Sequence, residues 1–143
     1  MGLVIQGQAV IKGMAQGIAL VTDEPLSFWG GYDFRTGEIT DRRHNLSGEN
    51  AAGRILAVPF SRGSSTTTAV LLEAVRANTA PAAIITTNVD TFFALASIVA
   101  DEMYSRPFPI VALSKLDFAR LKSGDSLIIS EEGTIHIEPA GGG

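Results

Sequence analysis

The sequence predicts an α/β fold in which a central, partly parallel sheet carries helices and is extended by further strands. Residues 54–113 alternate short apolar runs with two segments of helical periodicity, which is typical of a β-α-β-α-β chain. Both ends of the chain contain short apolar segments bounded by glycine, which indicate additional strands. The length of 143 residues suits one domain over residues 1–143. Residues 140–143 are expected to form a flexible tail.

The first third of the chain predicts two strands followed by a long irregular segment. Residues 3–11 and 17–21 are apolar enough for strands, and Lys12 and Gly13 suit the turn between them. Residues 23–53 are rich in Gly, Pro, Asp and Asn, and only 38–40 suits a strand. An irregular stretch of about 30 residues in a compact domain is often functional or covers another surface.

The remaining elements are more regular. Strands are predicted at 54–58, 82–86 and 108–113, and a hairpin pairs 126–130 with 134–138. A helix over 65–77 would bury the apolar face formed by Val70, Leu71, Ala74 and Val75. Asp90 is a favourable N-cap for a second helix over 91–104. The apolar face of that helix would consist of Phe92, Leu95, Ala96, Val99 and Met103.

Composition argues against several classes of function. The net charge is −4 and no stripe of Lys or Arg exists, so nucleic acid is not an expected partner. No apolar run reaches the roughly 20 residues of a membrane span, and no signal-peptide pattern opens the chain, so we expect a cytoplasmic protein. Without cysteine, and with only His44 and His136, the chain is not expected to bind metal by itself. The charged fraction of 18% is low, which suits either a surface covered by another chain or a well-packed monomer.

The segment over residues 59–68 has the best potential for chemistry. A buried strand ends there, a glycine-containing turn follows, and a helix begins, and parallel sheets bind ligands at this end of their strands. Ser64 and Ser65 would lie at the positive end of the helix, Arg62 would offer a forked donor to a carboxylate or phosphate, and Gly63 would permit close approach. The alternative is that the serines only cap the helix. The segment is neither a P-loop nor a nucleophile elbow.

Other polar and aromatic residues have weaker functional potential. Phe28 and Trp29 precede two glycines, and they either fill the edge of the core or line an interface. Asp33 and Asp41 suit turns better than acid catalysis. His44, in a polar loop, is expected to be a surface histidine.

Several motifs in the same order resemble the swivel domain, or small subunit, of aconitase X. The resemblance covers roughly residues 5–115, and its segments are 17–21 (GIALV), 25–31 (PLSFWGG), 36–41 (TGEITD), 44–48 (HNLSG), 53–56 (GRIL), 62–65 (RGSS), 70–73 (VLLE) and 80–85 (APAAII). It implies a swivelling β/β/α domain and a hydro-lyase that removes water from a hydroxylated carboxylic acid. Because this chain is short and lacks cysteine, it looks like the small subunit of a two-chain enzyme. The iron–sulfur cluster would then be bound by the large catalytic partner subunit.

The resemblance also implies roles for individual residues. Ser64 matches the family's Gly-Ser motif and would be the catalytic base that removes the Cα proton, while Arg62, Gly63 and Ser65 would bind substrate. The helix N-terminus, Arg62 and a nearby iron would together stabilise the serine alkoxide. The chain departs from the usual pattern at Thr67 and Thr68, where a Gly-Ser-like pair is expected.

Three functions remain open at this point. The segments 27–31 and 62–65 look more like those of bacterial hydroxyproline-type members, which favours cis-3-hydroxy-L-proline as the substrate and Δ1-pyrroline-2-carboxylate as the product. The second function is that of a phosphomevalonate dehydratase small subunit. The third, of another class, is a phosphohistidine carrier or a non-catalytic regulatory domain. A carrier predicts a histidine where Ser64 and Ser65 stand.

Overall fold

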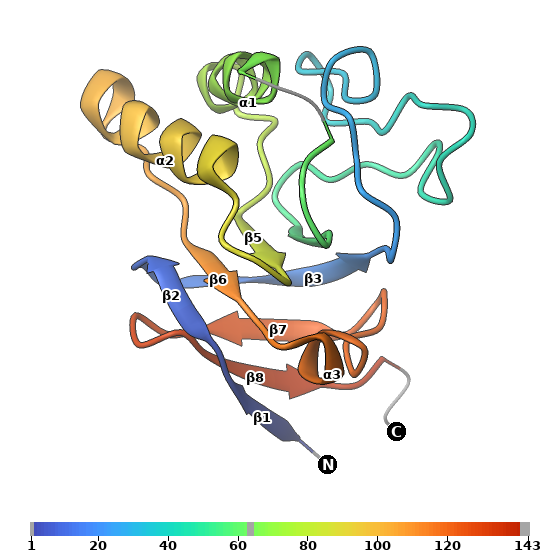
Figure 1. The fold of residues 1–143 in the computed structure, drawn as a ribbon, viewed down its shortest axis with the longest axis vertical. Helices are drawn as coiled ribbons and strands as arrows, with labels where there is room; N and C mark the ends of the chain where they lie inside the picture. The colour runs from blue at the N-terminus through green and yellow to red at the C-terminus, as the bar shows by residue number, and fades with distance from the viewer. Residues whose placement is uncertain (1, 63–64, 141–143) are drawn as a thin grey trace.

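The computed structural model describes residues 2–62 and 65–140, and in them one mixed sheet forms the centre of the fold (Figure 1). The sheet has eight strands within this part of the chain, in the order β1-β8-β7-β3-β4-β5-β6-β2. These strands are β1 (Leu3–Gln6), β2 (Gln8–Ile11), β3 (Ala15–Val21), β4 (Ile55–Ala57), β5 (Ala83–Thr86), β6 (Ile110–Ala112), β7 (Ser126–Ile129) and β8 (Thr134–Glu138). The helices of the described residues are α1 (Thr66–Arg76), α2 (Thr91–Tyr104) and α3 (Lys115–Phe118).

The sheet combines a parallel and an antiparallel part. β3, β4, β5 and β6 are mutually parallel. α1 connects β4 to β5 and α2 connects β5 to β6, as expected for crossovers between parallel strands, whereas the irregular segment connects β3 to β4. β2 pairs antiparallel with β6, and β7, β8 and β1 continue antiparallel from the other side of β3. The predicted α/β class with a partly parallel sheet is therefore confirmed.

Gly7 divides the single strand predicted over residues 3–11 into two. β1 and β2 lie at opposite ends of the strand order, yet only Gly7 separates them in sequence, so the sheet curves round until it is nearly closed. A Cβ at Gly7 would lie 2.4 Å from Val111 Cγ1, so a larger residue does not fit this bend. Apolar periodicity cannot register such a break, because the residues on both sides of it are strand-like.

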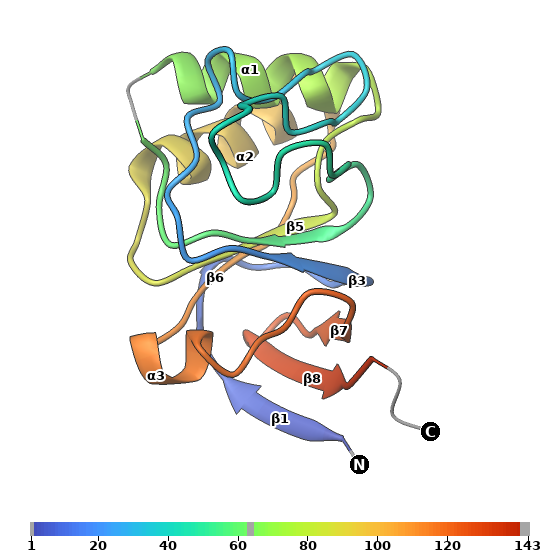
Figure 2. The same ribbon diagram turned by 90° about the vertical axis from the view of Figure 1, so that its right-hand side faces the viewer.

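α1 and α2 lie side by side over one face of the parallel strands (Figures 1 and 2). The predicted buried face of α1 is confirmed, since Val70, Leu71, Ala74 and Val75 are all buried. In α2 the predicted face is confirmed for Ala96, and Phe92 and Val99 are half-buried. The prediction was wrong for Leu95 and Met103, which are 44% and 61% exposed, and the face that packs is centred on Phe93, Ala96, Ser97 and Ala100. α2 is apolar on almost every side, so its pattern did not identify the face that packs.

The irregular segment between β3 and β4 packs beside α1 and α2 and supplies part of the core (Figure 2). Its buried apolar side chains include Leu26, Phe28, Tyr32, Ile39 and Leu46. Phe28 stacks on Tyr32 at 5.1 Å between ring centroids and meets Phe93 edge-on at 5.5 Å. The strand predicted at 38–40 is reduced to isolated bridges, from Tyr32 to Ile39 and from Glu38 to Asn50. A second cluster of buried residues, contributed largely by β1, β7 and β8 and by the other face of β4 and β5, fills the curve of the sheet.

Candidate functional site

The carboxyl ends of β4, β5 and β6 meet at one edge of the sheet because these strands are parallel. The segments that leave this edge are the turn from β4 to α1, the turn from β5 to α2, and the residues between β6 and α3. Parallel sheets bind their ligands at such an edge. The turn from β4 to α1 carries the predicted site, so its surroundings decide what that site can do.

Hydrogen bonds hold the described part of the β4–α1 turn from three directions. Thr87 donates to the Pro59 carbonyl through both its backbone N–H, at 3.1 Å, and its hydroxyl, at 3.2 Å. The Asp90 carboxylate accepts from the Ser61 backbone N–H at 2.7 Å and from the Ser61 hydroxyl at 2.8 Å. The Arg62 N–H donates to the Leu26 carbonyl at 2.9 Å. The turn is thereby attached both to the β5–α2 turn and to the irregular segment.

The structure describes two of the four predicted site residues, Arg62 and Ser65. Arg62 is exposed, with its backbone fixed as above. Gly63 and Ser64 lie outside the described residues. Ser65 occupies the N-cap position of α1, but its side chain makes no capping hydrogen bond, so the capping role considered for this serine has no support among the described contacts. Instead, the Ser65 carbonyl accepts the Ala69 N–H at 3.2 Å.

Arg62 borders a polar hollow of about 420 Å³. Its lining comes from the irregular segment and the turn: Glu24, Pro25, Ser27, Asp41, Arg43, His44 and Arg62. Within the described part of the chain, neither the Arg43 nor the Arg62 guanidinium forms an ion pair or a side-chain hydrogen bond. The lining also contains the Glu24 and Asp41 carboxylates, so its formal charges balance. The two guanidinium groups can still receive a small anion by geometry, since the fork of donors on Arg matches carboxylate and phosphate oxygens.

His44 is a structural residue of this hollow, and the prediction of a surface histidine was wrong. Its side chain is buried. Nδ1 accepts the Leu46 N–H at 3.1 Å, so the proton of the neutral ring belongs on Nε2, which lies 3.3 Å from the Glu24 carbonyl. Both ring nitrogens are thus engaged with backbone groups. Asp41 accepts the Arg43 N–H at 3.0 Å, which confirms its predicted place in a turn.

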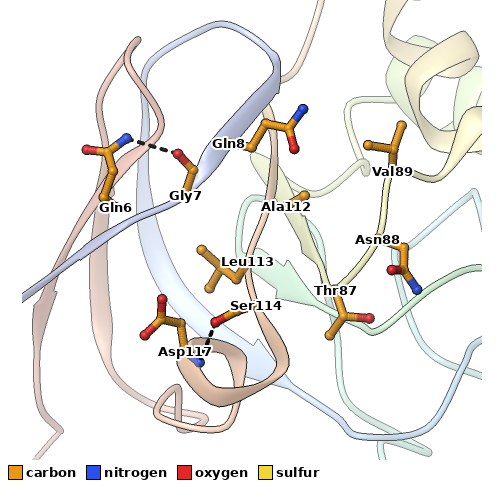
Figure 3. Close-up of a pocket in the computed structure, with 10 residues that line it drawn as sticks. All are labelled: Gln6, Gly7, Gln8, Thr87, Asn88, Val89, Ala112, Leu113, Ser114 and Asp117. Carbon is orange, nitrogen blue, oxygen red and sulfur yellow. Dashed lines mark hydrogen bonds between the residues drawn. The ribbon is translucent and has the colours of Figure 1, made fainter.

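A larger hollow of about 550 Å³ opens at the same edge of the sheet, beside β2 and β6 (Figure 3). It is lined by Gln6, Gly7, Gln8, Thr87, Asn88, Val89, Ala112, Leu113, Ser114 and Asp117. The Ser114 hydroxyl accepts the Asp117 N–H at 3.1 Å, and the Gln6 amide donates to the Gly7 carbonyl at 2.9 Å. The Asp117 carboxylate is the one charged group of this lining, so the hollow is not suited to an anionic ligand. The sequence did not indicate this hollow, because its residues come from three segments that are far apart in the chain, 6–8, 87–89 and 112–117.

The described residues do not offer the donors of a metal cluster. They contain no group of three His, Asp or Glu side chains that could hold a metal ion. The sequence has no cysteine, the usual ligand of iron–sulfur clusters. In the same part of the chain no helix is long and apolar enough to cross a membrane.

A family model described as the aconitase X swivel domain matches residues 4–137. The chain belongs to this family. The swivel domain is therefore both the predicted and the observed fold. A chain in the crystal structure of Thermococcus kodakaraensis aconitase X in its holo form superimposes with a TM-score of 0.85 at 30% identity, covering 96% of this chain and 99% of that one.

Curated relatives of this swivel domain carry two different names. A cis-3-hydroxy-L-proline dehydratase from Pseudomonas aeruginosa is 44% identical over 108 residues, which are 76% of this chain and 19% of that protein. A phosphomevalonate dehydratase small subunit from Pyrococcus furiosus is 34% identical over 134 residues, which are 93% of this chain and 94% of that protein. This chain thus spans about a fifth of the hydroxyproline dehydratase but nearly the full length of the small subunit.

Proposed function

We propose that this chain is the small subunit of a two-chain hydro-lyase that dehydrates cis-3-hydroxy-L-proline to Δ1-pyrroline-2-carboxylate. The observation that carries the proposal is the position of Arg62 and Ser65 in the β4–α1 turn, at the carboxyl edge of the sheet and beside a hollow that Arg43 and Arg62 border. The two-chain arrangement is supported by small subunits of similar length. The substrate is supported by the higher identity, 44%, to a hydroxyproline dehydratase.

In this proposal Ser64 is the base that removes the Cα proton. The proton goes to the Ser64 oxygen, the electrons of the broken C–H bond form the Cα–Cβ double bond, and the Cβ–O bond breaks. The departing hydroxide takes a proton from solvent to become water, Ser64 returns its proton to solvent, and the resulting enamine tautomerises to the imine product. A serine hydroxyl has a pKa far above neutrality, so its alkoxide needs positive potential nearby. The N-terminus of α1 and the Arg62 guanidinium supply such potential from this chain.

Arg62, Gly63 and Ser65 would bind the substrate. Arg62 would receive the substrate carboxylate in a bidentate contact, and Ser65, whose side chain does not cap α1, would donate or accept a further hydrogen bond. Gly63 would let the substrate approach the backbone of the turn. Arg43 lines the same hollow and would add a second positive charge.

The partner would be a large catalytic subunit that closes this edge of the sheet. It would bind the iron–sulfur cluster, because this chain has no cysteine and its described residues contain no metal-binding group. When bound, the cluster would supply a Lewis acid for the leaving hydroxyl. Phe60 and Val89 lie in the turns at this edge, and Trp29 follows Ser27 of the polar hollow by two residues. Their exposures of 44%, 55% and 72% suit coverage by another chain.

Phosphomevalonate is the second candidate substrate. It is favoured by the small subunits from archaea, which match this chain over nearly their whole length. Arg43 and Arg62 would serve a phosphate as well as a carboxylate. The segments 62–65 and 27–31 do not decide between the two substrates on chemical grounds.

The phosphohistidine-carrier alternative is weaker. It requires an accessible histidine at the start of a helix, whereas Ser65 holds the N-cap position of α1. His44 is buried and has both ring nitrogens engaged. A purely regulatory subunit remains the alternative that a catalytic test must address.

The test is an assay of the two-chain complex. The chain is produced anaerobically with a large-subunit partner, and water loss from cis-3-hydroxy-L-proline is measured for wild type and for Ser64→Ala. We expect activity that needs both chains and falls by a factor of 10³ or more in the variant, on the order expected for loss of a catalytic base. Ser114→Ala, at the other hollow, is the matched control and should keep wild-type kcat.

Each contrary result has a distinct meaning. An assembled, iron-containing complex that ignores hydroxyproline but dehydrates phosphomevalonate would replace the substrate and keep the rest of the proposal. Full activity of Ser64→Ala on either substrate would remove the serine base and support the regulatory alternative.

A further inference from the structure

The Asp90 carboxylate joins the turn that carries the proposed site to a helix that follows it in the chain. We infer that Asp90 is a positioning residue that holds the β4–α1 turn in register with α2. This inference rests on the function proposed above, because it assigns Asp90 the task of placing Ser64 and Arg62 for catalysis. Sequence patterns identified Asp90 only as the cap of α2.

The two carboxylate oxygens of Asp90 serve two different segments. Oδ1 accepts the N–H groups of Phe92 and Phe93, at 3.0 and 3.1 Å, and so caps α2. Oδ2 accepts the backbone N–H and the hydroxyl of Ser61, at 2.7 and 2.8 Å, across 29 residues of sequence. A cap needs only the first pair of bonds. The second pair is a separate attachment to the turn.

Asp90 is nearly buried, at 8% exposure, and its bonds to Ser61 have the short distances of charge-assisted hydrogen bonds. Ser61 directly precedes Arg62 and lies three residues before Ser64. Pro59 is held separately by Thr87, and the Arg62 N–H by Leu26. Asp90 is therefore the attachment that ties the middle of the described turn to α2.

The helices on either side of the turn are also joined to each other. The Thr68 hydroxyl of α1 donates to the Phe92 carbonyl of α2 at 3.0 Å. α1 and α2 are therefore in contact beyond the turn, and Asp90 fixes the turn to the same end of α2. A displaced Ser61 would shift the turn relative to both helices, and a displacement of about 1 Å is enough to slow an enzyme on the order of 100-fold.

Asp90→Asn separates the two tasks of this side chain. Asparagine caps helices as well as aspartate, so its carbonyl oxygen retains the bonds to Phe92 and Phe93. Its NH₂ group then faces the Ser61 N–H, and two donors cannot bond. Amide hydrogen exchange on the full chain should show faster exchange at Ser61, with the Phe92 and Phe93 amides still protected.

In the assembled two-chain enzyme we expect Asp90→Asn to lower kcat on the order of 10- to 100-fold with a smaller change in KM. The KM change is smaller because the bond from Arg62 to Leu26 remains. Ser97→Ala is the matched control. Ser97 is fully buried and bonds both the N–H and the carbonyl of Phe108, at 2.9 and 2.6 Å, so its loss should lower the melting temperature but leave kcat unchanged.

A double variant separates positioning from general loss of structure. If Asp90 acts by placing Ser64, Asp90→Asn has no further effect on kcat in the Ser64→Ala background. Where Ser64→Ala is itself slow, an equal loss of kcat from Asp90→Asn in both backgrounds overturns the inference. Unchanged protection of the Ser61 amide overturns it in every case.

The two proposals can fail separately. An inactive Ser64→Ala with an unchanged Asp90→Asn overturns the role of Asp90 and leaves the serine base intact. A fully active Ser64→Ala with a slow Asp90→Asn removes the serine base but retains Asp90 as the residue that places Arg62. If both variants keep wild-type kcat, both proposals are wrong.

Discussion

At the scale of single residues, buried polar side chains in this protein bond to segments that are distant in sequence. Tyr32 is buried and donates its hydroxyl to the Thr79 carbonyl at 2.8 Å, across 47 residues. Burial raises the pKa of the Tyr32 hydroxyl above its ordinary value, because the phenolate would lose its hydration. Tyr32 thus attaches the irregular segment to the residues that follow α1.

Tyr32→Phe tests this attachment. The variant leaves the Thr79 carbonyl without its bond, so we expect a loss of about 1–2 kcal/mol in the free energy of unfolding at neutral pH, measured by urea denaturation. Tyr104→Phe is the control, because the Tyr104 hydroxyl has no hydrogen bond among the described residues, and no comparable loss is expected.

The difference between wild type and Tyr32→Phe should also depend on pH. Because the folded-state pKa of Tyr32 is raised, its contribution is complete below the unfolded-state pKa of about 10 and declines as pH rises above that value. The two unfolding free energies should therefore converge above about pH 10. A difference that stays constant into that range would contradict the proposed burial of the hydroxyl.

At the scale of elements, the β7–β8 hairpin closes the curved sheet against the β1–β2 bend. The Gly7 N–H donates to the Gly133 carbonyl at 3.0 Å, and the Gln6 amide donates to the Glu132 carbonyl at 3.0 Å. Gly133 has a φ of +84°, and a Cβ there would lie 2.9 Å from the Ala9 nitrogen. The hairpin tip is therefore limited to glycine both by its conformation and by backbone contact.

Comparing Gly133→Ala with Gly53→Ala separates the cost of the left-handed backbone from the cost of steric overlap. Gly53 also has a positive φ, +70°, but a Cβ there meets no atom within 4 Å among the described residues. Both variants should lose about 1–2 kcal/mol for the left-handed backbone. Gly133→Ala should lose about 1–3 kcal/mol more through overlap with backbone. Equal melting temperatures for the two variants would show that the hairpin tip does not close against β2.

At the scale of the whole molecule, α1, α2 and the irregular segment lie on one side of the parallel strands and α3 lies on the other (Figure 2). The polar hollow of the proposed site is lined by the irregular segment and by the β4–α1 turn. Large apolar side chains remain exposed on the described surface, including Trp29, Phe60 and Val89. In the proposed two-chain enzyme the carboxyl edge of the sheet faces the large subunit, so assembly should change the environment of Trp29.

The fluorescence of Trp29 measures this directly, because it is the single tryptophan of the chain. Subtracting the emission spectrum of a complex that contains Trp29→Phe from that of the wild-type complex leaves the emission of Trp29. We expect this emission to lie at a shorter wavelength than the emission of the isolated chain. The shift follows from removing a side chain that is 72% exposed from water. An unshifted difference spectrum from an active complex would place the partner on another face.

The sequence by itself predicted the α/β class, the two long helices, the buried face of α1 and the family. These features depend on local periodicity, capping residues such as Asp90, and ordered motifs, all of which are present in the linear chain. The roles of Ser64, Arg62, Gly63 and Ser65 came from the resemblance and stay predictions. So do the single domain over residues 1–143 and the tail at 140–143.

Only the tertiary structure decided how distant segments meet. In the structure, Gly7 separates residues 3–11 into two strands at opposite ends of the sheet. α2 buries Phe93 and Ala100 rather than Leu95 and Met103, and the His44 side chain is buried and bonded to backbone of the irregular segment. The structure also revealed the second attachment made by Asp90. Each of these depends on contacts between residues far apart in the chain, which local propensity does not register, since the packing of one segment is determined by the segment it meets.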